Sequence, residues 1–335
     1  MNDYILELKD LHTDFVSKTN GSVTHALNGV SFGVERGKIL GLVGESGSGK
    51  SVSMLSVLKL LSNDARYSGE ILLNGENIIN YSQAQMRKVR GGKISIIFQD
   101  PMTSLNPVYT IGNQICEMIR QQRPDVKDPE AYAAELLEMV GISDAENRLK
   151  QYPYELSGGQ RQRVAIAIAL SSNPDILVAD EPTTALDVTV QAQIIDLIKN
   201  LTIRRRMTTI LITHDLGIVA GNCDDVVVLY AGRVCEQGTA REIFKNPKHE
   251  YTKGLIAAVP GAVEGRLVPI EGTPVNLNAM PDGCAFCARC GKAMDICLHE
   301  LPPSKTFSAT HSASCWMNEL PEGFDPFEKE AQNDR

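Results

Sequence analysis

A run of eight residues, Gly44–Ser51, constrains this chain more than any other stretch of its sequence. It reads Gly-Glu-Ser-Gly-Ser-Gly-Lys-Ser and matches the whole pattern G-x-x-x-x-G-K-S/T of a phosphate-binding loop. An apolar run, Ile39–Val43, leads into the loop, and a stretch with helical spacing, Val52–Leu61, leads out of it. This order of strand, loop and helix is the context that the motif requires.

The residue types of the loop suit an anion. Its glycines let the backbone turn tightly, so that successive N–H groups point inward, and the following helix adds the positive end of its dipole. Lys50 can place a cation on the β- and γ-phosphates, and the Ser51 hydroxyl can ligate Mg²⁺. A glycine-rich turn that binds nothing is the alternative, but it would not need all eight positions. We expect ATP phosphates to be bound by Gly44, Glu45, Ser46, Gly47, Ser48, Gly49, Lys50 and Ser51.

Length and composition are those of an ordinary soluble globular protein. The 335 residues suffice for a large core and predict two domains, with 43% apolar and 22% charged residues. The net charge of −8 and the pI near 5.4 argue against a surface dedicated to nucleic acid. No signal peptide is seen, and no apolar run approaches the ~20 residues that span a bilayer. We therefore expect a cytosolic chain whose membrane role comes through partners.

The pattern along the chain predicts an α/β protein. Residues 4–34 are typical of strands around a turn, and short strands at 69–79 precede a helix at 82–89. Residues 110–150 change to helical spacing, which predicts a helical insertion between two halves of the core. Strands then alternate with helices from 175 to 237, including a hairpin of 225–230 and 232–237, and predict a mostly parallel sheet with covered faces.

The organisation changes near residue 246, where Gly, Pro and Cys replace the periodic pattern. We expect a first domain over residues 1–245, with a helical subdomain at about 100–157, and a second over residues 246–335. The stretch 319–335 is acidic and contains proline, which predicts a frayed tail.

Two acids follow an apolar strand at 176–179. Asp180, at the strand end, can hold Mg²⁺ opposite Ser51, directly or through water. Because side chains alternate along a strand, the Glu181 carboxylate should point toward the γ-phosphate, which suits a residue that orients or deprotonates the attacking water. Two strand-end acids in surface ion pairs are the alternative.

A second set of phosphate-binding features lies at Leu156–Arg163. Ser157 is an N-cap residue, and Gly158 and Gly159 expose backbone N–H groups where a helix begins, just before Gln160. One chain does not need two such sites for one γ-phosphate, so this segment is expected to serve a nucleotide that another subunit holds. Taken alone, such a helix start is common.

Together these segments resemble the nucleotide-binding subunit of an ATP-binding-cassette (ABC) transporter. The resemblance covers residues 4–245 and implies a P-loop ABC cassette, with a RecA-like core, an antiparallel β-subdomain and a helical subdomain. The segments appear in family order: the phosphate loop Gly44–Ser51, the glutamine loop at Gln99, the signature Leu156–Gln160, the pair Asp180-Glu181, then Ala185-Leu186-Asp187 and the switch residue His214.

The resemblance implies roles that spacing alone does not assign. Gln99 would sense Mg²⁺ and the attacking water and would link the site to the membrane subunits; the alternative is a strand-end amide. His214 would contact the γ-phosphate, and Asp187 would couple the two sites of a dimer that sandwiches two ATP molecules. The alternatives are a satisfied strand-end histidine and a helix N-cap. Phe15 either stacks on the adenine ring or packs against the sheet.

A finer resemblance lies in Phe98–Pro107 and in the C-terminal extension, which look like those of the D-type ATPase of dipeptide or oligopeptide importers. It implies ATP hydrolysis at the cytoplasmic face of the inner membrane, as a peripheral subunit. The implied partners are a homologous second ATPase, two permease subunits and an extracytoplasmic peptide-binding protein. An importer of nickel or another small solute is the nearest alternative, and a soluble ABC ATPase that acts on DNA or ribosomes is a weaker one.

Five of the eight cysteines crowd into Cys284–Cys315, which in a reducing cytosol favours a metal over disulfides. Four of them resemble, in spacing, the pattern with which some peptide-importer ATPases hold a 4Fe–4S cluster: Cys284, Cys290, Cys297 and Cys315. Cys287 departs from that pattern, and its presence also allows tetrahedral zinc or unliganded thiols. The scattered cysteines are expected to be small buried hydrophobic residues: Cys116, Cys223 and Cys235.

Overall fold

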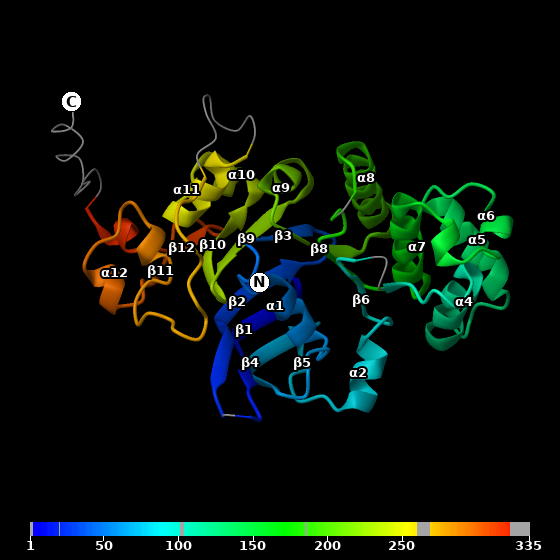
Figure 1. Cartoon of the computed structure of the whole chain (residues 1–335), viewed down its shortest axis with the longest axis horizontal. Helices are drawn as coiled ribbons and strands as arrows, with labels where there is room; N and C mark the ends of the chain where they lie inside the picture. The colour runs from blue at the N-terminus through cyan, green and yellow to red at the C-terminus, as the bar shows by residue number, and fades with distance from the viewer. Residues whose placement is uncertain (1–2, 20, 101–103, 185, 260–268, 322–335) are drawn as a thin grey trace.

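The computed structural model describes residues 3–19, 21–100, 104–184, 186–259 and 269–321 (Figure 1). Part of the expected glutamine-loop motif (101–103), Ala185 and most of the expected acidic tail lie outside these residues. Every helix of the described ranges is too short or too polar to cross a bilayer.

The centre of the fold is an eight-stranded sheet in the order β11-β12-β10-β9-β3-β8-β7-β6. The strands from β6 to β9 pair in parallel, and β10 returns antiparallel to β9, as the predicted hairpin requires. Nearly every residue of the parallel strands is buried, since helices cover both faces. The central strands are β3 (Ile39–Val43), β6 (Ile94–Ile97), β7 (Ile176–Asp180), β8 (Thr208–Thr213), β9 (Asp225–Tyr230) and β10 (Arg233–Thr239). The α/β prediction is confirmed.

A second, antiparallel sheet has the order β2-β1-β4-β5 and lies below the central sheet in Figure 1. Its apolar residues face the same core as α1 and the inner side of β3, β7 and β8. β-Bulges interrupt the alternation in the pair of its two long strands without ending their pairing. Its strands are β1 (Tyr4–Val16), β2 (Val23–Glu35), β4 (Ala65–Leu73) and β5 (Glu76–Asn77).

The helical part contains the predicted insertion and the helix that carries the signature. Polar N-caps begin the long helices: Thr110 and Ser157 accept hydrogen bonds from backbone N–H groups of their first turns, and Asp128 does the same. The helices are α4 (Ile111–Gln122), α5 (Pro129–Met139), α6 (Ala145–Arg148), η1 (Pro153–Glu155) and α7 (Gly158–Ser171).

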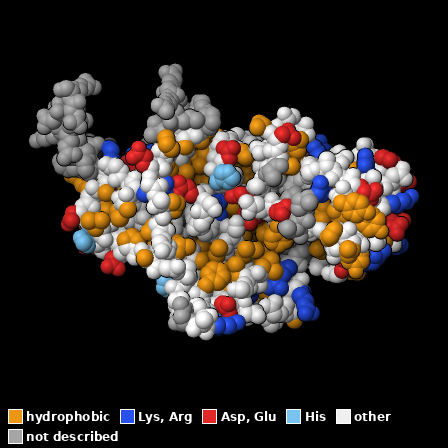
Figure 2. Space-filling model, viewed as in Figure 1, with side chains coloured by type: hydrophobic (Ala, Val, Ile, Leu, Met, Phe, Trp, Pro, Cys, Tyr) orange, Lys and Arg blue, Asp and Glu red, His pale blue; other side chains and the backbone are white. Residues whose placement is uncertain are grey.

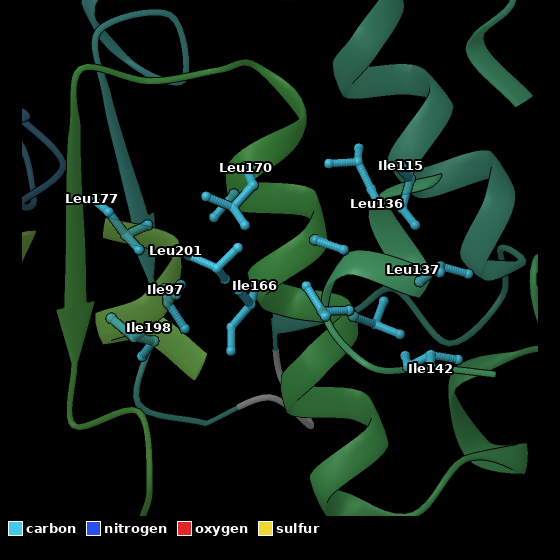
Figure 3. Close-up of a cluster of buried hydrophobic side chains, with 14 of the residues drawn as sticks. Ile97, Ile115, Leu136, Leu137, Ile142, Ile166, Leu170, Leu177, Ile198 and Leu201 are labelled. Carbon is cyan, nitrogen blue, oxygen red and sulfur yellow. The ribbon is translucent and has the colours of Figure 1, made fainter. Parts of the chain in front are cut away.

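One continuous apolar core joins this helical part to the central sheet. Figure 3 shows α7 in the middle, with Ile166 and Leu170 between the side chains of the insertion and those of the sheet. The insertion contributes Ile115, Leu136, Leu137 and Ile142, and the sheet side contributes Ile97, Leu177, Ile198 and Leu201. The helical part is therefore held by burial of apolar surface on both sides of α7.

The remaining helices flank the sheet: α1 (Lys50–Val57), α2 (Gln83–Val89), α8 (Val188–Arg205), α9 (Leu216–Asn222), α10 (Ala240–Lys245) and α11 (Glu250–Ala257). α1 ends earlier than predicted, since Lys59 has a left-handed φ of 49° that the helix cannot continue through. The periodicity does not predict α9, α10 or α11, which have only six to eight residues each.

Residues 269–321 form a C-terminal lobe of short elements, at the opposite end of the molecule from the helical part in Figure 1. Its elements are η2 (Cys287–Arg289), α12 (Ile296–His299), β11 (Ser304–Thr306), β12 (Ser312–Ser314) and η3 (Trp316–Glu319). β12 pairs antiparallel with β10, so the lobe extends the central sheet. Phe286 packs edge-on against Tyr230 of β9 and contacts Tyr251 of α11, so the lobe and the cassette share a core.

Candidate active site

The phosphate loop occupies the turn between β3 and α1, as the sequence predicts. Gly44 has a φ of 149°, and a Cβ at this position would lie 2.2 Å from the carbonyl oxygen of Leu229. Gly49, the N-cap of α1, has a left-handed φ of 103°. Both positions therefore require glycine, one because β9 passes so closely and one because of its backbone conformation.

Lys50 lies inside this loop and is only 5% exposed. Its Nζ donates to the carbonyl oxygens of Gly44 and Glu45, at 2.7 and 2.8 Å. Burial lowers the pKa of Lys50, and the nearby acids oppose that shift. The buried Ser48 hydroxyl has no hydrogen-bond partner among the described residues. A buried cation bonded only to carbonyls, beside a free hydroxyl, fits a loop that receives an anion.

The structure brings Ser51 and Asp180 together, as expected for the Mg²⁺ site. Ser51 Oγ donates to Asp180 Oδ1 at 2.8 Å, joining the first turn of α1 to the end of β7. Asp180 is 6% exposed, and burial raises the pKa of its carboxyl. A hydroxyl and a carboxylate oxygen are hard donors of the kind that Mg²⁺ prefers alongside phosphate oxygens, so the residues present fit this ion.

Glu181 is the point on which several side chains converge. Its Oε2 accepts a hydrogen bond from Gln99 Nε2 at 2.7 Å and another from Thr184 Oγ1 at 3.1 Å. Its Oε1 lies 3.1 Å from His214 Nδ1. Both oxygens of the carboxylate are thus held by neighbouring side chains. Gln99, expected as an Mg²⁺ ligand, contacts Glu181 here.

The sheet order explains this convergence. β6, β7 and β8 are parallel neighbours, so the residues that follow their carboxyl ends, Gln99, Glu181 and His214, meet at one edge. Glu181 itself has a left-handed φ of 44°, and its N–H donates to the Ile212 carbonyl, which turns the chain out of β7. Sequence reasoning missed Thr184, although a hydroxyl three residues after Glu181 in a turn is a signal for such a contact.

The signature segment does not contact its own phosphate loop in the described residues. Ser157 is exposed, and its hydroxyl accepts from the N–H of Gln160 at 3.3 Å, while Gln160 Oε1 accepts from the N–H of Ser157. Gly158 is exposed, and a Cβ on Gly159 would lie 2.9 Å from Val190 Cγ1 of α8. The segment is therefore a capped helix start, open to solvent beside α8.

Asp187 lies at the start of α8 in this chain, and Phe15 lies on β1. Asp187 is exposed and caps α8, with Oδ1 accepting from the N–H of Val190 at 3.0 Å. Phe15 lies on β1 and is partly buried, two residues beyond Thr13 and hence on the same face. Thr13 contacts Ser56 of α1 through their hydroxyls at 2.9 Å, which places this face of β1 against the loop helix.

The 4Fe–4S expectation finds no support in the structure. The lobe brings chain segments of the cluster together, since the N–H of Cys284 donates to the carbonyl of Cys297 at 2.8 Å. However, the described residues contain no group of three or more His, Cys, Asp or Glu side chains arranged to hold a metal ion. The four expected cluster ligands lie close enough to interact electrostatically, but in the described residues their side chains are not arranged as a metal-binding group: Cys284, Cys290, Cys297 and Cys315.

The thiols sit in apolar surroundings instead. Burial raises the pKa of Cys284 to about 12 and that of Cys290 to about 11, which favours protonated thiols. Cys235, expected to be an isolated hydrophobic residue, is buried close enough to Cys284 and Cys315 to interact with them electrostatically. Cys116 is buried in the helical part, as predicted, and Cys223 is partly buried.

Two family models match the chain. The model described as ABC transporter matches residues 27–184, and the one described as oligopeptide/dipeptide transporter, C-terminal region, matches residues 235–297. The oligopeptide transport ATP-binding protein OppD of Bacillus subtilis is 47% identical, over 93% of this chain and 88% of that protein. The dipeptide transport ATP-binding protein DppD of the same organism is 45% identical, over 94% and 95%.

Solved structures agree with the sequence relatives. The ATP-binding cassette MJ0796, in a dimeric post-hydrolysis state bound to ADP and Pi, is 28% identical and has a TM-score of 0.62. The similarity covers 70% of this chain and 99% of that one. The cassette fold and the matched relatives lead to one conclusion: the chain belongs to the family of ATP-binding proteins of peptide ABC transporters.

Proposed function

We propose that this chain binds and hydrolyses ATP to energise the import of dipeptides or oligopeptides through a membrane ABC transporter. The observation that carries the proposal is the meeting of Gln99, Thr184 and His214 on Glu181, beside the Ser51–Asp180 pair. The peptide cargo rests on the relatives, which are named as oligopeptide and dipeptide transport proteins.

Each residue of the site has a separate role in phosphoryl transfer. Lys50 leaves its loop carbonyls to bind the phosphate oxygens, and the loop N–H groups hold the rest of the phosphate chain. Ser51 and Asp180 would hold Mg²⁺, which neutralises charge on the phosphates. Glu181 orients the attacking water and accepts its proton, while Gln99 and His214 fix the two oxygens of its carboxylate. Thr184 supports the same carboxylate.

A second cassette is needed to complete the site. Ser157 and Gly158 of the signature are exposed, so the N-terminus of this helix can face a nucleotide on another subunit. The similar cassette MJ0796 is dimeric in its solved structure, which holds ADP and Pi. We infer a homologous second ATPase as the partner, with Asp187 beside the signature of each subunit and Phe15 next to the adenine.

A groove beside the helical part suits the permease subunits. It has a volume of about 760 Å³ and is lined by apolar side chains of β6, α4, α7 and the segment after α1, and by the basic residues of α2. Figure 2 shows apolar side chains around β6, with blue side chains at α2 next to them. Phe98, adjacent to Gln99, is 43% exposed there. A helix from the membrane subunit seated in the groove would contact the segment that carries Gln99.

Peptide uptake tests the proposal most directly. Cells that carry the whole transporter with Lys50→Ala should lose uptake of a labelled tripeptide, because the phosphate chain loses its cation. Lys150→Ala, at an exposed lysine of the helical part, is the matched control and should leave uptake unchanged. Normal peptide uptake with Lys50→Ala, or a loss confined to nickel uptake, would contradict the assignment. Copurified permeases and an extracytoplasmic binding protein would support a peripheral position at the cytoplasmic face.

We also propose that the cysteines of the lobe bind a 4Fe–4S cluster. Their sulfur atoms would have to rearrange to bind it. The proximity of Cys284 and Cys297 and the spacing of the four residues support it. Anaerobically purified protein should contain about four irons per chain and lose them in Cys284→Ser, but not in Cys223→Ser. Zinc in place of iron, or no metal, would overturn it.

A further inference from the structure

The C-terminal lobe forms an ion pair with one residue of the phosphate loop, Glu45. Arg289 Nη1 lies 2.6 Å from Glu45 Oε2, and Arg289 Nη2 lies 2.9 Å from Glu45 Oε1, which makes a bidentate pair. The Arg289 side chain is only 4% exposed, and that of Glu45 is 27% exposed. The two residues are 244 positions apart, so the pair joins the lobe to the second residue of the loop. Bidentate, partly buried pairs of this kind fix geometry as well as charge.

Arg289 is itself held in place by the lobe. Its Nε donates to the carbonyl of Glu271 at 3.0 Å, and Nη2 donates to the carbonyl of Ile270 at 3.3 Å. The guanidinium also lies over the rings of Tyr230 and Phe286, 5.9 and 5.8 Å from their centroids. Such a restrained guanidinium loses little entropy when it pairs with a carboxylate.

A second contact holds the backbone of Glu45. Its N–H donates to the hydroxyl of Tyr251 at 2.7 Å, and Tyr251 is fully buried in α11. The N–H of Glu45 therefore points toward the C-terminal part of the chain and away from Lys50, which bonds the carbonyl oxygen of Glu45. Both the backbone and the side chain of this loop residue are thus fixed by elements that follow the cassette core.

The charge of Glu45 explains why such a pair matters. Its carboxylate is one residue from Gly44, in a loop expected to receive the four negative charges of ATP, and it interacts electrostatically with Lys50. A carboxylate without a partner at this place would repel the nucleotide and compete for Lys50. An arginine guanidinium is charged throughout the physiological range, so the bidentate pair neutralises the acid.

We propose that Arg289 is a positioning residue for ATP binding, through which the C-terminal lobe neutralises Glu45 and fixes the phosphate loop. The inference rests on the proposed nucleotide site at Gly44–Ser51. It makes the lobe part of the ATP site of its own chain, in addition to any role toward the transporter. Loss of the arginine should then weaken ATP binding by adding an unpaired negative charge, and removing that charge should restore it.

A charge-removal cycle tests this. In the full-length chain, Arg289→Gln should weaken the affinity for a fluorescent ATP analogue roughly 10-fold, and more at low salt. Glu45→Gln should weaken the affinity less than Arg289→Gln does, because its amide oxygen still accepts from Arg289 and no unpaired negative charge is added. The double variant should return to within about threefold of the wild type, because neither charge remains. In the assembled transporter, the Arg289→Gln defect should appear in the KM for ATP more than in kcat.

The outcomes separate this inference from the assignment of the site. A double variant as weak as Arg289→Gln, or a defect that salt does not reduce, would show that Arg289 acts only as a structural support. Wild-type affinity of Arg289→Gln would overturn the inference and leave the ATP site standing. A wild-type chain that binds no ATP, or binds it equally well with Lys50→Ala, would overturn the proposed site as well. Thermal unfolding of each variant identifies any that fail to fold.

Discussion

The two ends of the molecule are attached to the sheet by opposite kinds of interaction (Figure 1). The helical part joins it mainly through the large apolar core around α7, with a few exposed or partly buried hydrogen bonds beside it. The C-terminal lobe has a smaller aromatic contact around Phe286 and adds several buried or bidentate polar pairs. Apolar burial is non-directional and insensitive to pH and salt, whereas each polar pair fixes a geometry and depends on charge.

The polar attachment of the lobe is centred on two acids of the cassette. Glu236 is fully buried and accepts hydrogen bonds from the N–H groups of Lys248 and His249, and it lies 2.8 Å from His311 Nε2. Glu242 accepts from the hydroxyl of Ser308, among others. The position of the lobe is therefore fixed by directional hydrogen bonds and ion pairs. This suits a region that contacts a single carboxylate of the phosphate loop. The position of the helical part is set mainly by the packing of apolar side chains.

The largest effect is expected at Glu181, because no residue of the helical part or of the lobe can take over the role of its carboxylate. Glu181→Gln keeps the shape of the side chain but removes the base, so kcat should fall roughly 100-fold or more while ATP still binds. ATPase assays of the assembled transporter and nucleotide binding by the same preparation check both parts. Glu135→Gln, at an exposed position of α5, is the control. Wild-type turnover by Glu181→Gln would remove Glu181 from the mechanism.

Next in size is a truncation in the helical part. Leu137 is fully buried in the core around α7, and Leu137→Ala should lower the free energy of unfolding by about 3 kcal/mol. Urea unfolding followed by circular dichroism measures it, with exposed Glu138→Ala as the control that should change it little. A loss that did not spread to the sheet, seen by hydrogen exchange, would contradict a shared core.

A polar substitution should give a smaller and more local effect in the lobe. Glu236→Gln turns an amide NH₂ toward donors that the carboxylate now accepts, and should cost about 2 kcal/mol. Hydrogen exchange should show faster opening in β12 and α11 but not in α4 or α5. Exposed Glu300→Gln is the control. Equal loosening of the helical part would erase the distinction between the two attachments.

The smallest effect concerns pH. His249 is buried and caps α11, with Nδ1 accepting from the N–H of Tyr251 at 3.0 Å, and burial lowers its pKa to about 4. The unfolded chain binds this proton near pH 6.5 and the folded chain does not, so stability falls with pH below 6.5. Between pH 6.5 and 5.5 the loss should be about 1 kcal/mol.

His249→Asn separates this titration from the rest of the chain. Asparagine remains an N-cap but carries no titrating group, so the variant should lose less stability than the wild type between pH 6.5 and 5.5. Urea unfolding at the two pH values, on both proteins, measures the difference. The same pH dependence in both would show that His249 does not titrate on unfolding.

Most of the cassette could be predicted because its local patterns agree with its tertiary contacts. The apolar runs of 39–43 and 176–179 became buried parallel strands, and the helical spacing of 110–150 became α4 and α5. The nucleotide site followed because motif positions at neighbouring strand ends must meet. Thr184 was missed because a hydroxyl three residues after an acid is a common pattern, and its contact here depends on the left-handed turn at Glu181.

The C-terminal lobe could be predicted much less well, for physical reasons. Its strands have three residues each and no alternation, and its position depends on pairs such as Arg289–Glu45 that join distant parts of the sequence. Cysteine spacing alone also does not fix where sulfur atoms point, which is why the metal expectation gained no support. The sequence marks the lobe as different without indicating what it contacts.

The pairing of β12 with β10 has a consequence for how the protein is made. β12 lies roughly 75 residues after β10 in the chain, so β10 leaves the ribosome long before β12 does. Until then the growing sheet keeps an open edge whose backbone groups can pair with another nascent chain. The last described strands therefore cover a sheet edge that stays exposed during synthesis. Shortened chains that lack these strands should be prone to self-association.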